Sequence, residues 1–228
     1  MVGEPVGKSH TYSMSVNLSR SERFINTRRA LLSAARGLFA ERGFAATLTE
    51  DVVSVAGLTR GALYHHFADK HDLFRGVYVE MQAEMSQRVA QAAAERLAEL
   101  RQLGDPKGRF IRERIGAGCD AYLAGCADPA YRRIVLIDAP SVLDLRTRLE
   151  ISGDSQVEAL ARALRGAMNL GELTRQPARP LAHLLMGALG AAGFYIGNAD
   201  DANAARDQVT ATLRSLIDGL RPPPGGSR

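Results

Sequence analysis

The sequence has little cysteine and no tryptophan. Its two cysteines, Cys119 and Cys126, lie seven positions apart, which on a helix places them on one face, roughly 10 Å from each other. That separation is too large for a disulfide between them, and free cysteine is among the residue types most often buried. Such sparse use of cysteine is typical of a reducing compartment and predicts a cytoplasmic protein.

A long hydrophobic run and a signal-peptide pattern are also missing. The most apolar stretch, Leu181 to Gly197, is interrupted by His183, and its length suits a buried or interface helix better than a membrane span. No apolar run follows a basic start near the N-terminus. We therefore expect neither an export signal nor a membrane partner.

The patterns of common enzymes and metal sites are absent as well. The sequence contains no Gly-rich phosphate loop, no nucleophile elbow, no HExxH and no Cys/His cluster at metal spacing. His65 and His66 are adjacent, so on a helix they point in different directions and make poor joint metal ligands. We predict no enzyme activity, no cofactor and no metal. An enzyme that uses a C-terminal cavity is one alternative, which turnover of a bound ligand would support.

The charge balance is weak support for any one partner. The formal net charge is +4 and the pI is about 9.3, both compatible with nucleic-acid binding. However, residues 1–80 contain ten Lys and Arg against eight Asp and Glu, so the excess is not concentrated there.

No run alternates polar and apolar residues, whereas the helical period of 3.6 recurs along the chain, so we predict an all-α protein. The first helix ends at Gly43, and a long helix runs from near Asp69 to about Gln102, before Gly104-Asp105-Pro106. Further helices are expected at 108–126, 129–138, 141–151, 154–171, 178–198 and 202–220.

The informative segment runs from Thr47 to Lys70 and has the pattern of a helix-turn-helix. Thr47 and Glu50 have capping-box spacing for a short helix. Gly57 suits the tight turn, and Thr59 is the expected N-cap of a second helix with Leu63 and Phe67 turned inward.

The run Gly61-Ala62-Leu63-Tyr64-His65-His66-Phe67, followed by Asp69-Lys70 and Leu73-Phe74, resembles the signature of TetR/AcrR-type regulators. Ala34-Ala35, Leu38-Phe39 and Glu41-Arg42-Gly43-Phe44 in the preceding helix resemble that family too. One departure is Thr49, where the family more often has an aliphatic residue. The resemblance implies a three-helix helix-turn-helix domain (23–68) and a larger helical ligand-binding and dimerisation domain (69–221). Residues 1–22 lack apolar periodicity and the tail 222–228 begins with three prolines, so we expect a disordered arm and a disordered tail.

The resemblance also implies which residues contact double-stranded operator DNA. They are Thr47, Thr59, Arg60, Gly61, Ala62, Tyr64, His65 and Lys70. Arg60 is the candidate for a bidentate contact to guanine, and Lys70 begins a helix whose N-terminus favours phosphate. The alternatives are that Arg60 is a solvated surface charge and that Tyr64 belongs mostly to the core. The basic segment 20–29 either touches the minor groove or backbone or is an ordinary basic tail.

The last two helices are expected, by the same resemblance, to pair with their symmetry mates in a homodimer. The candidate interface residues are Gly187, Gly190, Ala191, Phe194, Val209, Leu213, Leu216, Ile217 and Leu220. Packing of these small and apolar residues within one monomer is the alternative. A two-fold dimer presents its recognition helices about 34 Å apart, one DNA turn, and so predicts a pseudo-palindromic operator.

The middle helices are expected, again by resemblance, to enclose a cavity for an unknown small-molecule effector. Its candidate lining residues are Tyr122, Tyr131, Arg133, Asp138, Met168, His183 and Tyr195, although Asp138 is equally suited to cap the turn that follows it. The predicted function is a repressor released by a small, largely apolar ligand. A rival is an interaction protein that has kept the fold and lost specific DNA binding.

Overall fold

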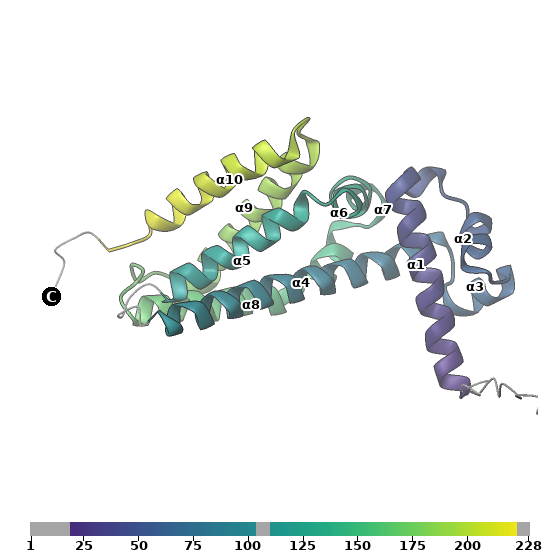
Figure 1. The fold of residues 1–228 in the computed structure, drawn as a ribbon, viewed down its shortest axis with the longest axis horizontal. Helices are drawn as coiled ribbons and strands as arrows, with labels where there is room; N and C mark the ends of the chain where they lie inside the picture. The colour runs from purple at the N-terminus through teal and green to yellow at the C-terminus, as the bar shows by residue number, and fades with distance from the viewer. Residues whose placement is uncertain (1–18, 104–109, 223–228) are drawn as a thin grey trace, which may run out of the picture.

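The structure, a computed structural model, describes residues 19–103 and 110–222, and no strand occurs in these ranges (Figure 1). The chain is all-α, as predicted, with a small cluster of three N-terminal helices and a larger helical domain. The tail 223–228 and most of the arm, residues 1–18, for which we expected disorder, lie outside the described residues.

The first helix, α1 (Arg20–Ala46), begins inside the segment expected to be a disordered arm. Ser19 and Glu22 form a capping box: the Ser19 N–H donates to the Glu22 carboxylate at 2.7 Å, and the Glu22 N–H donates to the Ser19 hydroxyl at 3.2 Å. Gly43 interrupts the helix with φ 79°, a left-handed conformation that suits glycine. The regular part of α1 therefore ends at the glycine that the sequence pattern indicated.

Helices α2 (Thr49–Ala56) and α3 (Arg60–His66) pack beside α1 at one end of the long helix α4 (Lys70–Gln102) (Figure 1). Their shared core consists of side chains that are almost fully buried: Leu31, Leu32, Ala35, Leu38, Phe39, Val52, Leu63, Phe67, Leu73 and Phe74. Because Leu73 and Phe74 belong to α4, the long helix is part of this core and carries it into the C-terminal domain.

The C-terminal domain is built on α4 and α5 (Phe110–Cys126), which run side by side in opposite directions (Figure 1). Next come the short α6 (Pro129–Tyr131), a π-helix, η1 (Arg132–Asp138), and α7 (Ala139–Val142). The helices α8 (Leu145–Asn169), α9 (Ala178–Asn198) and α10 (Ala202–Asp218) complete it.

Three helix predictions for this domain are wrong. The helix expected at 141–151 is interrupted, because α7 ends at Val142 and α8 begins at Leu145. The break expected at Gly153 is absent, because α8 continues through that residue without interruption. The single helix expected at 129–138 is instead one turn of α-helix followed by the π-helix. A π-helix is rare and frequently occurs at functional sites.

Helix α9 is, by length and composition alone, apolar enough to cross a membrane, and a third of its most apolar window is buried in the monomer. Interface helices of soluble proteins have the same composition, so length and composition do not distinguish the two cases.

Candidate DNA-binding surface and effector region

The turn between α2 and α3 is built as the sequence pattern indicated. Gly57 ends α2 in the left-handed conformation, with φ 65°, and its N–H donates to the carbonyls of Val53 and Ser54. Leu58 is partly buried against the core. The Thr59 hydroxyl accepts a hydrogen bond from the Ala62 N–H at 3.2 Å, so Thr59 is the N-cap of α3.

Helix α3 has one buried side and one exposed side. Leu63 and the following Phe67 are buried in the core. Arg60, Gly61, Tyr64 and His65 are exposed and Ala62 is half-buried. The alternative that Tyr64 belongs mostly to the core is wrong, because 44% of the residue is exposed.

Arg60 has ordered neighbours although it is exposed. Its Nη1 lies 3.1 Å from the Glu50 carboxylate, its guanidinium lies over the Tyr64 ring at 5.6 Å, and 66% of its side chain remains exposed. The pKa of Glu50 is lowered, chiefly by hydrogen bonds from its own N–H and from the Thr49 hydroxyl, with a smaller effect of Arg60. The guanidinium is thus held over α3 and stays available to a partner.

The roles predicted for Thr47 are wrong. Leu48, not Thr47, is the N-cap of α2, and it makes no side-chain cap. Thr47 is completely buried, and its hydroxyl donates to the Gly43 carbonyl at 2.8 Å. A buried hydroxyl with this partner braces the end of α1 and does not reach a phosphate.

Lys70 is also used inside the protein rather than presented outward. Its ammonium donates to the Thr47 carbonyl at 2.9 Å and to the Ala45 carbonyl at 3.3 Å, and it lies 4.3 Å from the centre of the Phe44 ring. In this structure Lys70 therefore joins the start of α4 to the α1–α2 connection, which is a correction to its expected phosphate contact.

The predicted dimer residues divide into three groups: buried, exposed and half-buried. Leu213 and Ile217 are buried in the monomer core, so for them the alternative of packing within one monomer holds. Gly187 and Gly190 border open space, and Ala191 is exposed. Val209 and Leu220 are half-buried.

An exposed apolar face remains on α9 and α10. Phe194 and Leu216 are 56% and 58% exposed. A shallow groove of about 290 Å³ lies between the two helices. It is lined by Ala188, Ala192, Tyr195, Gln208, Val209, Thr212, Leu213 and Leu216.

The residues predicted to line an effector cavity do not share one site. Met168 is buried in the core and Tyr122 is half-buried, whereas His183 is exposed on α9 and Tyr195 lines the α9–α10 groove. The prediction is wrong for His183 and Tyr195, because helical periodicity did not reveal which side of α9 is covered.

Arg133 and Asp138 bind the end of α1, in contrast to the cavity role predicted for them. The buried Asp138 carboxylate accepts hydrogen bonds from the Phe44 N–H at 2.7 Å and from Arg133 Nε at 3.4 Å. The guanidinium of Arg133 fills the space beside Gly43, where a Cβ atom would lie 1.9 Å from Nη2. The Asp138 side chain caps no turn. The π-helix thus holds the two domains together through α1.

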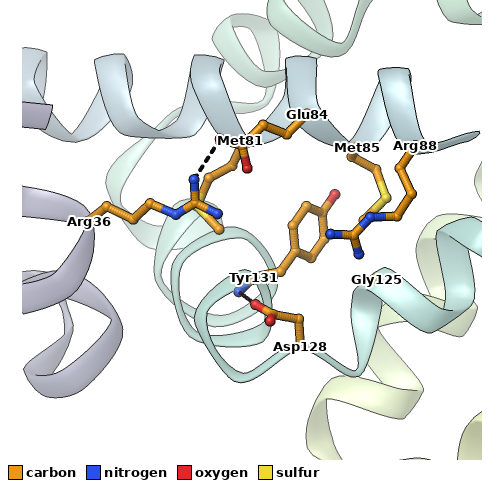
Figure 2. A pocket seen from close by; sticks show the side chains of 8 residues that line it. All are labelled: Arg36, Met81, Glu84, Met85, Arg88, Gly125, Asp128 and Tyr131. Atoms are coloured by element: carbon orange, nitrogen blue, oxygen red, sulfur yellow. Dashed lines mark hydrogen bonds and ion pairs between the residues drawn. The ribbon is translucent and has the colours of Figure 1, made fainter. Parts of the chain in front are cut away.

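Figure 2 shows a small hollow of about 40 Å³ where α1 meets α4, α5 and α6. Its lining comprises Arg36, Met81, Glu84, Met85, Arg88, Gly125, Asp128 and Tyr131. Arg36 of α1 pairs with Glu84 of α4 at 2.6 Å, and this hydrogen bond raises the pKa of Arg36. The hollow has room for about one water molecule, so an organic ligand requires these side chains to move.

Tyr131 connects this hollow to a buried polar chain. Its hydroxyl donates to Gln82 Oε1 at 3.2 Å, and Gln82 Nε2 donates to the Tyr78 hydroxyl at 2.7 Å. Burial raises the pKa of both Tyr122 and Tyr131, so these phenols remain neutral hydrogen-bonding groups. Sequence periodicity did not identify Gln82, a polar residue on an otherwise apolar stripe of α4.

The described residues contain neither a metal-binding cluster nor a reactive cysteine. No group of three or more His, Cys, Asp or Glu side chains there is arranged to hold a metal ion. Cys119 and Cys126 are free and buried, and burial raises the pKa of each thiol to about 12, so neither forms a thiolate near neutral pH.

Comparison with known proteins agrees with this architecture. Residues 31–77 match the family model described as bacterial regulatory proteins, tetR family, and residues 112–220 match the model of a tetracyclin repressor-like C-terminal domain. Together these segments cover the helix-turn-helix and most of the larger domain. The chain belongs to the TetR family of bacterial transcriptional regulators.

Individual relatives support the same assignment. A TetR-family transcriptional regulator from Pectobacterium atrosepticum has 33% identity and a TM-score of 0.72, over 90% of this chain and 98% of that one. The transcriptional repressor AcnR of Corynebacterium glutamicum is 30% identical over 60% of this chain and 70% of its own length. The transcriptional regulator CymR of Pseudomonas putida is 30% identical over 50% of this chain, and the match spans 58% of CymR.

Proposed function

We propose that this protein is a cytoplasmic repressor that binds a pseudo-palindromic operator as a homodimer and is released by a small, largely apolar ligand. The observation that carries the proposal is the exposed side of α3, where Arg60 is held by Glu50 above a helix anchored through Leu63 and Phe67. Relatives named as repressors, such as AcnR, point to repression.

The proposed DNA contacts are the exposed and half-buried residues on the outer side of α3 and at its N-cap. Thr59, Arg60, Gly61, Ala62, Tyr64 and His65 form this surface. Arg60 is assigned the bidentate contact to guanine O6 and N7, because its guanidinium is exposed beside α3 and always charged. Thr47 and Lys70 are assigned to the scaffold beneath it.

The proposed dimer uses the exposed apolar face of α9 and α10. Phe194 and Leu216 leave large apolar surfaces in water, and Gly187 and Gly190 let a partner helix approach closely. Exposed contiguous apolar surface of this kind marks interaction sites. Pairing of this face across a two-fold axis accounts for the apolar composition of α9 without a membrane.

The proposed effector site lies between α4, α5 and α6, around the hollow in Figure 2. Met81 and Met85 are flexible side chains that rearrange readily around a ligand. A ligand there displaces α4 or η1, and η1 holds α1 through Asp138. To change the ratio of DNA-binding to released conformation from 99:1 to 1:99, the ligand must bind the released conformation about 10⁴-fold more tightly.

The first test is selection of binding sites from random duplex DNA by the purified protein, followed by titration of the selected site at several salt concentrations. We expect a pseudo-palindrome bound by a dimer, with affinity that falls steeply with salt. Absence of an enriched sequence, with folded dimeric protein, would contradict the proposal.

Effector coupling is tested by calorimetric titration of candidate apolar ligands with and without operator. Coupling requires weaker ligand binding in the presence of operator, since linkage is reciprocal. Equal ligand affinity in both titrations would eliminate the release mechanism and leave the DNA-binding proposal intact.

A further inference from the structure

Helix α1 extends well beyond the segment that defines the family. The family model begins at residue 31, whereas α1 begins at Arg20. Residues 20–30 add a helical segment about 16 Å long, which projects past α2 and α3 (Figure 1). Residues 20–26 are exposed. The capping box of Ser19 and Glu22 holds the first turn in helical form.

One face of this extension is directed toward the recognition helix. Phe24 lies against the end of α3, with its ring centre 4.2 Å from that of His66 and 5.9 Å, edge-on, from that of His65. Four residues later, Arg28 lies over the Phe67 ring at 4.9 Å. Arg20 is four residues before Phe24, so it falls on the same face, one turn beyond α3.

The extension is strongly basic. Residues 19–29 contain four arginines and one carboxylate, Glu22. That carboxylate is held by the Ser19 N–H, which is the main cause of its lowered pKa. Among the described residues no carboxylate pairs with Arg20. The face therefore carries positive charge directly beside the proposed DNA contacts of α3.

We propose that this extension is a second DNA-contacting surface, in which Arg20 binds a phosphate that flanks the bases read by α3. The inference rests on the proposed operator binding and extends the DNA-contacting surface from α3 to the start of α1. The fit is electrostatic: a rigid basic helix adjoining the recognition helix, facing a polyanion with one charge per about 1.7 Å of axis. A phosphate contact of this kind increases the affinity for DNA and does not distinguish between bases.

The test compares two duplexes that share the selected operator, one with long flanks and one trimmed to the bases contacted by α3. Wild-type protein is expected to bind the trimmed duplex several-fold more weakly. The variant Arg20→Ala is expected to bind both duplexes equally. On the long duplex its slope of log K against log salt should fall by about 0.9 per lost phosphate contact.

A matched control is Arg29→Ala. Arg29 is exposed and lies nine residues after Arg20, hence on the opposite side of the helix at 100° per residue. We expect Arg29→Ala to retain wild-type sensitivity to the flanks. Unchanged thermal unfolding of all variants shows that α1 remains folded.

Three outcomes overturn the inference. They are equal wild-type affinity for the two duplexes, an Arg20→Ala variant that still distinguishes them, and an Arg29→Ala variant that weakens binding as much as Arg20→Ala does. A wild-type protein that selects no operator would instead overturn the proposed function itself, and the inference with it.

Discussion

At the scale of single residues, Asp138 has the most consequential contacts outside α3. It joins two segments that are 94 positions apart in sequence, because its carboxylate accepts from the Phe44 N–H while Arg133 supplies a compensating positive charge. Buried carboxylates of this kind are stabilising only while their partners remain.

Asp138→Ala is therefore expected to lower the free energy of unfolding by about 1–3 kcal/mol, since it leaves the Phe44 N–H and Arg133 without their acceptor. Urea denaturation measures the change. The matched control is Asp207→Ala, whose carboxylate is 72% exposed and pairs with Arg206 beside it; a surface change of this kind stays within about 0.5 kcal/mol. Equal effects of the two substitutions would remove the special role of Asp138.

Thr47→Val tests the scaffold role of Thr47. Loss of the hydrogen bond to the Gly43 carbonyl should lower the free energy of unfolding by about 0.5–1.5 kcal/mol. The slope of operator affinity against salt should not change, because no phosphate contact is lost. A reduced salt slope in Thr47→Val, with little change in stability, would restore the phosphate contact predicted from the sequence.

At the scale of secondary-structure elements, the contact between α1 and the end of α3 makes stability depend on pH. The pKa of His66 is lowered by burial, and further by His65 and Arg28. Protonation of His66 is thus easier in the unfolded chain, where the pKa of histidine is ordinarily about 6.5, than in the folded one. Stability attributable to His66 is present above pH 6.5 and is lost as the pH falls below it.

Replacement of this imidazole by an amide should remove that dependence. In His66→Gln, urea midpoints at pH 7.5 and pH 5.5 should differ less than in the wild-type protein. His71→Gln, which replaces an exposed histidine near the start of α4, is the comparison. An unchanged difference in His66→Gln would assign the pH dependence to other groups.

Helix α3 itself is only seven residues long, so its orientation depends on its cap and its two anchors. For Arg60→Ala we expect a loss of about 1–3 kcal/mol in operator binding, concentrated at one base pair of each half-site. Titration of operators with single base-pair changes measures this: the variant should no longer distinguish bases at that pair. Uniform weakening on every operator would show that Arg60 contacts phosphate instead.

At the scale of the whole molecule, the proposed function depends on the distance between two copies of α3. The exposed face of α9 and α10 is the proposed means of setting that distance, and Leu216 lies in its groove. Leu216→Arg should raise the dimer dissociation constant by about 30-fold or more, equivalent to a loss of at least about 2 kcal/mol. Sedimentation velocity measures dissociation, and operator affinity should fall in parallel.

The control for this change is Leu149→Arg, which places the same charge at a similarly exposed leucine of α8. We expect it to leave the dimer intact. Dissociation by Leu149→Arg alone, with Leu216→Arg still dimeric, would move the interface from α9 and α10 to α8.

The sequence by itself determined the features that local chemistry controls. Gly57 ends α2 because the turn needs a positive φ, and Thr59 caps α3 through the N–H of a residue three positions later. The burial of Leu63 is predicted by the helical period. These interactions join residues close in sequence, so spacing alone predicts them. The all-α class followed in the same way.

Only the tertiary structure decided which polar residues serve the scaffold. Lys70 and Thr47 looked suited to phosphate, yet their partners are carbonyls brought near by the fold. Asp138 looked like a cavity residue, and its partner Phe44 belongs to the other domain. A side chain's partner across space cannot be inferred from its position on a periodic stripe, because periodicity specifies a face of a helix and not what covers that face.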